Sequence, residues 1–235
     1  MGKDNLATVA GEFIESFSNI LEHQDLTHFS NTLRSVITGS VQSGPRPPIQ
    51  HPAMQHLQSM SPAITNSAMQ NAAQTLDWGQ LYEGGGIDPA LAEGMFAAQA
   101  VGTYGVYPGE SVAAGLFLLA PGVHYPLHTH AAREVYHCLA GEVEITHRLN
   151  EAPVTLCKDQ SSETPSGRLH ALQTGANPVL LAYIWTGEIS APTWWWEQQK
   201  NGEWHRTAWR RLPGESWKPE RREPVDAAAF DNAML

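Results

Sequence analysis

Hydrophobic positions in the first part of the chain recur at three- and four-residue spacing. Between Leu6 and about Ile37 they form two runs, at Val9, Phe13, Phe17, Ile20 and Leu21, and then at Leu26, Phe29, Leu33 and Val36. This is the period of an amphipathic helix, so the spacing predicts two helices, each with one apolar face. The proline-rich stretch 43–52 predicts a connector, because proline fixes φ and removes a backbone donor. Helical character returns between Pro52 and about Gln80, and Asp88-Pro89 predicts a further short helix running toward Ala100.

After Gly102 the pattern changes to short apolar runs separated by glycine and proline. These runs are GLFLLAP, EVYHCLAG, EVEITHRL, PVTLCK and VLLAYIWTG, and the stretch 203-EWHRTAWRRL-212 alternates well enough to be one more strand. Such spacing is typical of an all-β barrel or sandwich. The sequence therefore predicts a mainly β protein, with an α-helical extension over residues 1–100 and a β-barrel domain over residues 101–235. Because short helices are marginal alone in water, we expect the extension to pack on the barrel.

Composition and charge exclude several classes of function. A net charge of −10 at pH 7 argues against a nucleic-acid surface, which needs clustered Lys and Arg. No apolar stretch is long enough to predict a membrane span, and the first residues do not resemble a secretory signal. The two cysteines, Cys138 and Cys157, form no disulfide framework and fit a reducing compartment. We therefore expect a cytoplasmic location.

The stretch 122-GVHYPLHTHAAREVYHCLAG-141 gathers several groups that bind metals. His128 and His130 are two apart, so in a strand they share a face, and Glu134 follows four residues later. Two neutral imidazoles and a carboxylate suit a divalent transition metal. His170, which follows a predicted turn, is the candidate fourth ligand. Each of these residues alone is more often an ordinary polar side chain, but together they favour a metal site.

The same segment resembles the first motif of the cupins. The pattern G-x5-H-x-H-x3-E-x6-G is complete from Gly122 to Gly141. The second cupin motif is matched at Pro165, Gly167 and His170, but Asp159 stands where glycine is usual and Thr174 where asparagine is usual. The resemblance covers about residues 102 to 190 and implies a small double-stranded β-helix barrel with a metal in its mouth. The two departures fall on turns rather than on ligands.

Two tyrosines flank the metal-binding pattern. Tyr125 precedes His128 by three residues, and Tyr136 follows Glu134 by two and so shares its face in a regular strand. A phenol is a poor base at its ordinary pKa of about 10, but a neighbouring divalent cation stabilises the phenolate. Such a group could remove a proton from the carbon next to a metal-bound carboxylate. Tyr125 lies in the less regular segment 122–127 that precedes the histidines, and it is the favoured proton acceptor. Tyr136 would orient the carboxylate or share the deprotonation.

Three consecutive tryptophans, 194–196, follow the predicted strand that ends near Trp185. Aromatic faces attract a weakly hydrated cation such as a sulfonium by about 0.5 to 2 kcal/mol. Neighbouring residues in an extended segment point to opposite faces, so at most one or two of the three can contact a substrate. We predict that Trp194 and Trp196, together with Tyr183, contact the substrate.

A narrower resemblance follows from the run Y-P-L-H-T-H-A-A-R-E-V-Y-H-C-L-A-G-E at 125–142. With a helical extension before it and a tryptophan-rich segment after it, it looks like the cupin-type dimethylsulfoniopropionate (DMSP) lyases of marine bacteria, and in layout it is most similar to the Ddd-type L branch. The resemblance implies β-elimination of this zwitterionic sulfonium to dimethyl sulfide and acrylate. It also implies one divalent metal per chain at His128, His130, Glu134 and His170, with Tyr125 and Tyr136 at the two tyrosine positions.

Other interpretations of the metal and of the function stay open at this point. The metal could be Zn, Mn, Fe, Co or Ni, because three histidines and a glutamate do not select among them. A cupin dioxygenase would use the same ligands with ferrous iron and O₂, and a cupin isomerase would act on sugars. A metal-dependent sensor or binding module is a further alternative, although the sequence shows no helix-turn-helix. Cupins often associate, so we expect a homodimer.

Overall fold

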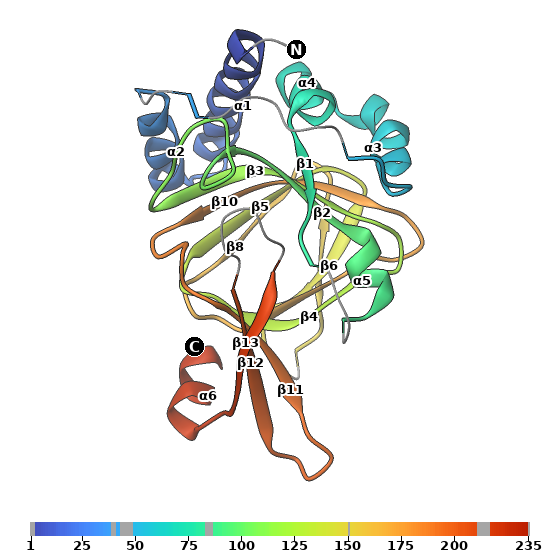
Figure 1. Ribbon diagram of the computed structural model, residues 1–235, viewed down its shortest axis with the longest axis vertical. Coiled ribbons are helices and arrows are strands. Elements are labelled where there is room, and N and C mark those ends of the chain that lie inside the picture. The colour runs from blue at the N-terminus through green and yellow to red at the C-terminus, as the bar shows by residue number, and fades with distance from the viewer. Residues whose placement is uncertain are drawn as a thin grey trace.

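The fold places two antiparallel β-sheets face to face, with helices over one of them (Figure 1). It is seen in a computed structural model that describes residues 3–38, 41–42, 49–82, 87–149, 151–210 and 217–234. Most of the predicted connector, residues 43–48, lies outside the described part of the chain.

Helices form most of the first 75 residues, as the apolar period predicted. They are α1 (Lys3–His23), α2 (Thr27–Arg34), the 3₁₀ turn η1 (Ser35–Thr38), α3 (Met54–Met60), the 3₁₀ turn η2 (Ser61–Ala63) and α4 (Ser67–Thr75). Asn66 caps α4 by accepting hydrogen bonds from the backbone N–H groups of residues 68 and 69. Phe13, Phe17 and Leu33 are fully buried and share one apolar cluster with Leu116 and Leu118 of the barrel. The helices therefore bury their apolar faces against the outer side of a sheet.

Strands begin earlier than the sequence predicted. Residues Trp78–Gln80 form β1, and the helix that Asp88 caps, α5 (Pro89–Gly94), gives way at once to β2 (Met95–Val101). The stretch from Met95 to Ala100 was predicted as helix, and that prediction is wrong. Its alanines favour a helix, but intrinsic propensity is a weak determinant of structure, and pairing of β2 with the next strand from Met95 to Val101 overrides it.

The barrel consists of the two sheets, and every strand pair in them is antiparallel. The first has the order β1-β2-β3-β10-β5-β8, with β3 (Val112–Leu119), β10 (Val179–Thr186), β5 (Arg133–Ala140) and β8 (Ser161–Thr164). The second has the order β13-β12-β11-β4-β9-β6-β7, with β13 (Lys218–Pro224), β12 (Trp204–Arg210), β11 (Thr193–Gln198), β4 (His124–Thr129), β9 (His170–Gln173), β6 (Glu142–Thr146) and β7 (Val154–Cys157). Because β10 lies between β3 and β5, and β9 between β4 and β6, the chain winds as the predicted double-stranded β-helix.

Turns of the two cupin motifs show why particular residues stand there. Gly141 has a φ of 82°, and a Cβ at this position would lie 2.3 Å from the carbonyl oxygen of Pro178, so only glycine fits. Asp159, which replaces the usual glycine of the second motif, also adopts a positive φ of 65°. Aspartate tolerates this region better than most residues, so the departure from the motif leaves the turn intact.

Strands β11 to β13 continue below the barrel as an arm, and the C-terminal helix α6 (Ala227–Met234) packs beside it (Figure 1). The backbone carbonyl of Ala233 accepts a hydrogen bond from the N–H of Leu169, next to the start of β9. Both cysteines are free thiols, as expected. Among the described residues, no helix has the length and apolar character needed to cross a membrane.

Candidate active site

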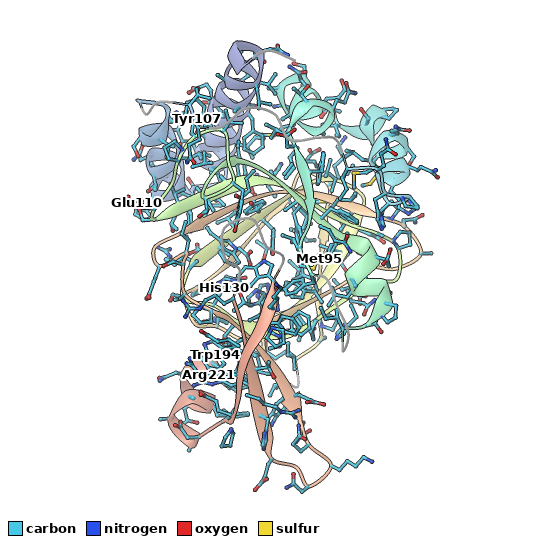
Figure 2. The ribbon with its side chains drawn as sticks, in the orientation of Figure 1. Met95, Tyr107, Glu110, His130, Trp194 and Arg221 are labelled. Carbon is cyan, nitrogen blue, oxygen red and sulfur yellow. The ribbon has the colours of Figure 1, made fainter. Side chains whose placement is uncertain are left out.

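The four predicted metal ligands meet inside the barrel, where the two sheets face each other. His128 on β4 lies opposite His170 on β9, His130 directly follows β4, and Glu134 comes from β5 in the other sheet. One nitrogen from each histidine lies within 4.8 Å of the other two. Oε2 of Glu134 lies 3.4 Å from Nε2 of His130 and 3.3 Å from Nε2 of His170. All four side chains are buried, and Figure 2 shows His130 within the body of the barrel.

Backbone carbonyls orient the three imidazoles. Nδ1 of His128 lies 2.8 Å from the carbonyl oxygen of Pro126, Nδ1 of His130 lies 2.8 Å from that of Ala132, and Nδ1 of His170 lies 3.0 Å from that of Arg168. A carbonyl oxygen can only accept, so each Nδ1 carries a proton and donates it. With Nδ1 used in this way, Nε2 is the ring nitrogen of each histidine that is available to bind a metal.

The protonation states also suit a metal. Burial raises the pKa of Glu134, but the neighbouring imidazoles of His130 and His170 outweigh it and hold that pKa well below its usual range. Burial, reinforced by His170 and His130, holds the pKa of His128 well below its usual value. The site thus presents a carboxylate and a neutral imidazole, the forms that coordinate metals.

Three buried atoms at this point have no hydrogen-bond partner in the described part of the chain. They are Nε2 of His130, Nε2 of His170 and Oε2 of Glu134. Buried polar atoms without a partner are rare, because leaving water without a replacement bond is costly. One cation bound among the three would satisfy all of them. The residues therefore fit a divalent metal, with no preference for a particular one.

A cavity of about 360 Å³ adjoins the ligand cluster. Aromatic residues form a large part of its wall, among them Tyr82, Phe117, Tyr125, Tyr136, Tyr183, Trp185 and Trp217, and Glu134 also lines it. The ring of Tyr125 stacks on His128 with centroids 3.9 Å apart, and the ring of Trp185 lies 4.3 Å from that of His130. The cavity therefore reaches the histidines through residues that lie directly against them. Its volume is near the lower end of the range for small-molecule sites, about 300 to 1,000 Å³.

Pairing of β5 with β10 places four of these residues on one face. Glu134 lies opposite Trp185, and Tyr136 lies opposite Tyr183, so all four side chains point into the barrel. The indole Nε1 of Trp185 donates a hydrogen bond to Oε1 of Glu134. Trp185 was not among the predicted site residues, although its position two residues after Tyr183 in one predicted strand was a usable signal.

Tyr125 and Tyr136, the two tyrosines predicted to take part in proton transfer, both line the cavity. Burial raises the pKa of Tyr125 well above its usual value, and the neighbouring Tyr82 raises it further. Burial likewise raises the pKa of Tyr136, and the nearby carboxylate of Glu134 adds to the effect. A positive charge bound beside Glu134 would oppose the contribution of that carboxylate.

Successive tryptophans of the run 194–196 point to opposite sides of the strand, as predicted. The middle residue, rather than the outer two, faces the barrel. Neither Trp194 nor Trp196 lines the cavity, in contrast to the role predicted for them. Trp194 lies on the arm next to Arg221 (Figure 2). The guanidinium carbons of Arg206 and Arg221 lie 4.2 and 4.7 Å from its ring centroid.

Trp196 is also turned away from the cavity. Its ring packs against Trp204 and Phe230, and its Nε1 donates to the Thr129 hydroxyl at 3.2 Å. The middle residue, Trp195, faces the barrel and contacts Tyr82 and Tyr125.

Residues 23–181 match the family model of dimethylsulfoniopropionate lyases. The chain belongs to this family. A relative is the dimethylsulfoniopropionate lyase DddQ of Ruegeria pomeroyi (strain ATCC 700808 / DSM 15171 / DSS-3), with 28% identity over 127 residues. The match spans 54% of this chain and 63% of that protein, so less than two thirds of the relative is covered.

Solved structures of such lyases share the fold. The crystal structure of DMSP lyase DddQ from Ruegeria pomeroyi DSS-3 has a TM-score of 0.56 and 26% identity, and the match covers 75% of this chain and 94% of that one. A second, from the work on the DMSP lyases RdDddP and RnDddQII, has a TM-score of 0.54 and 19% identity over 69% of this chain and 88% of the other, which supports the fold alone.

Proposed function

We propose that this protein is a metal-dependent lyase that splits dimethylsulfoniopropionate into dimethyl sulfide and acrylate by β-elimination. The observation that carries the proposal is the convergence of three histidines and a glutamate beside a cavity that Tyr125 and Tyr136 line. Membership of the DMSP lyase family supports the same reaction. The known reaction of DddQ, as its name states it, agrees with this chemistry.

His128, His130, Glu134 and His170 are the proposed holders of one divalent metal. When bound, the metal supplies a Lewis acid that stabilises negative charge on a substrate carboxylate and so makes the adjacent C–H bond more acidic. The donor set is compatible with Zn, Mn, Fe, Co or Ni. No change of oxidation state is required for an elimination.

Tyr125 is the proposed proton acceptor. Its deprotonated oxygen removes a proton from the carbon next to the carboxylate, and the C–H electron pair forms the new carbon–carbon double bond. The bond from the next carbon to sulfur breaks as this double bond forms, after the proton has left, and its electron pair leaves on sulfur as neutral dimethyl sulfide. The proton stays on the tyrosine oxygen until it passes to solvent. Tyr136, beside Glu134, is proposed to orient the carboxylate.

The aromatic walls of the cavity suit the sulfonium group of the substrate. Tyr183 and Trp185 of β10, Phe117 of β3 and Trp217 bring aromatic rings to the cavity wall. The faces of such rings attract a poorly hydrated cation by about 0.5 to 2 kcal/mol. In this proposal Tyr183 keeps its predicted contact with substrate, while Trp185 and Trp217 take the role that the sequence assigned to Trp194 and Trp196.

The proposal is tested by incubating metal-reconstituted protein with dimethylsulfoniopropionate in the absence of oxygen. We expect dimethyl sulfide in the headspace and an equal amount of acrylate in solution, with a Glu134→Ala variant as the inactive control. A reaction that needs O₂ would instead favour the cupin dioxygenase. Dimethyl sulfide no faster than in a protein-free sample would refute the proposal. The homodimer and the cytoplasmic location stay predictions of the sequence.

A further inference from the structure

Tyr82 reaches the candidate active site from the segment that precedes the cupin motifs. The backbone at Leu81 is held on both sides, because its N–H donates to the carbonyl of Met95 at 3.1 Å and its carbonyl accepts from the N–H of Trp217 at 3.0 Å. Tyr82 itself pairs with Trp217 in an isolated β-bridge. The chain is therefore fixed between β2 and the segment leading into β13 at the point where the tyrosine side chain leaves it.

Three tryptophans hold the ring of Tyr82. Its centroid lies 4.8 Å from that of Trp195, 5.5 Å from that of Trp209 and 5.9 Å from that of Trp217. Only 1% of the residue is exposed. Close packing on several sides leaves the ring little room to move, so its hydroxyl has a defined position.

That hydroxyl lies 2.8 Å from the hydroxyl of Tyr125. Tyr125 is also buried, so bulk water does not compete for this hydrogen bond. The ring of Tyr125 stacks on His128, while its oxygen is bonded to Tyr82. Tyr125 is thus held both at its ring and at its oxygen.

We propose that Tyr82 is a positioning residue for the elimination, and that its hydroxyl holds the oxygen of Tyr125 in place for proton transfer at the cavity wall. This inference rests on the proposed function. It assigns a role to a residue outside the region where the cupin resemblance was found. The expected effect is large because a displacement of about 1 Å in a reacting group can reduce a rate about 100-fold.

The first test compares Tyr82→Phe with Tyr107→Phe. Both substitutions remove only a hydroxyl, and that of Tyr107 donates to the carbonyl of Ala7 at 3.3 Å, in the helical cover. Tyr82→Phe should lower kcat about 10- to 100-fold with KM and metal content close to the wild-type values. Tyr107→Phe should leave kcat nearly unchanged. An unchanged kcat in Tyr82→Phe would overturn the inference.

A double variant separates positioning from general damage to the fold. If Tyr82 acts through Tyr125, Tyr82→Phe should cause no further loss of kcat in a Tyr125→Phe background. Independent, multiplying losses would show that Tyr82 does not act through Tyr125 and would overturn the inference.

An NMR measurement that does not depend on catalysis tests the contact between Tyr82 and Tyr125 separately from the proposed function. The chain has six tyrosines, so ¹³Cζ-labelled tyrosine gives few NMR signals, and that of Tyr125 is identified by its loss in Tyr125→Phe. Tyr82→Phe should move the Tyr125 signal, and Tyr107→Phe should not. An unmoved signal would overturn the inference even in an active enzyme. A wild-type protein that does not cleave dimethylsulfoniopropionate would refute the proposed function and, with it, the catalytic role of Tyr82, while a moved signal would still establish the contact.

Discussion

Trp185 binds one oxygen of Glu134 and leaves the other for the histidines. Its indole N–H donates to Oε1, whereas Oε2 faces His130 and His170 at 3.4 and 3.3 Å. The two residues are directly opposite each other on β10 and β5. A hydrogen bond to the outer oxygen of a ligating carboxylate fixes the direction of the inner one.

Trp185→Phe should therefore weaken metal binding while keeping an aromatic ring in the cavity. We expect metal affinity to fall about 10- to 100-fold, the usual effect of losing such a supporting contact. Competition of the protein with a coloured chelator measures this affinity. Trp194→Phe, outside the cavity, is the matched control, and equal affinities of the two variants would contradict the role of Trp185.

Alanine at His130, Glu134 or His170 should remove bound metal and activity together, because each side chain supplies part of the coordination sphere. His128→Ala should have a similar or somewhat milder effect. His124→Ala is the control, because this exposed histidine lies on β4 with His128 but contacts Gln173 rather than the other ligands. Metal content is measured by elemental analysis of dialysed protein. Full metal content in all four ligand variants would show that the site is assigned to the wrong residues.

Tyr125→Phe should lower kcat by about 10²- to 10⁴-fold with metal retained, the usual contribution of a general base. Tyr136→Phe should also weaken the binding of substrate or metal, because Tyr136 lies beside Glu134. Exchange of the substrate's α-hydrogen with solvent deuterium, followed by NMR, should disappear in the Tyr125 variant and persist in the other. The reverse pattern would assign the proton transfer to Tyr136, and two active variants would exclude a tyrosine base.

The N-terminal helices that pack on the first sheet should contribute directly to the stability of the barrel. Phe13 of α1 is fully buried in the cluster that includes Leu116 and Leu118 of β3. Phe13→Ala should reduce the free energy of unfolding by about 3 to 5 kcal/mol, through lost burial and the cavity left behind. Glu12→Ala, at the exposed neighbouring position, should change it by about 0.5 kcal/mol or less. Urea denaturation compares the two, and a similar small effect in both would show that α1 is dispensable to the core.

Elements with a clear local period could be predicted from the sequence. The three- and four-residue spacing led to α1 and α2, and the apolar runs led to β3, β5, β6, β7, β10 and β12. β1 and β2 were missed because their strand character comes from pairing with each other and with β3. Local propensity does not report such pairing.

The residues of the candidate site also fall into two groups, those that a local pattern predicts and those that only long-range packing places. His128, His130 and Glu134 could be predicted because they lie within seven residues of one another, and His170 because it follows a motif-like turn. The inward face of the tryptophan run depends on register, which places Trp195 opposite His128 on β4. Tyr82 lies 43 residues before Tyr125, and nothing in the local pattern signals their contact. Long-range packing alone brings Tyr82 to the cavity and Trp195 against two of the residues that line it.

Titration of metal-stripped protein with a divalent metal tests the central claim most directly. The rate of dimethyl sulfide release is measured after each addition, with Zn, Mn, Fe, Co and Ni in parallel. The account predicts no release without metal, and a rate that rises in proportion to bound metal and saturates at one ion per chain for at least one of the five. Release at the full rate from metal-free protein, or no release with any of these metals, would contradict it.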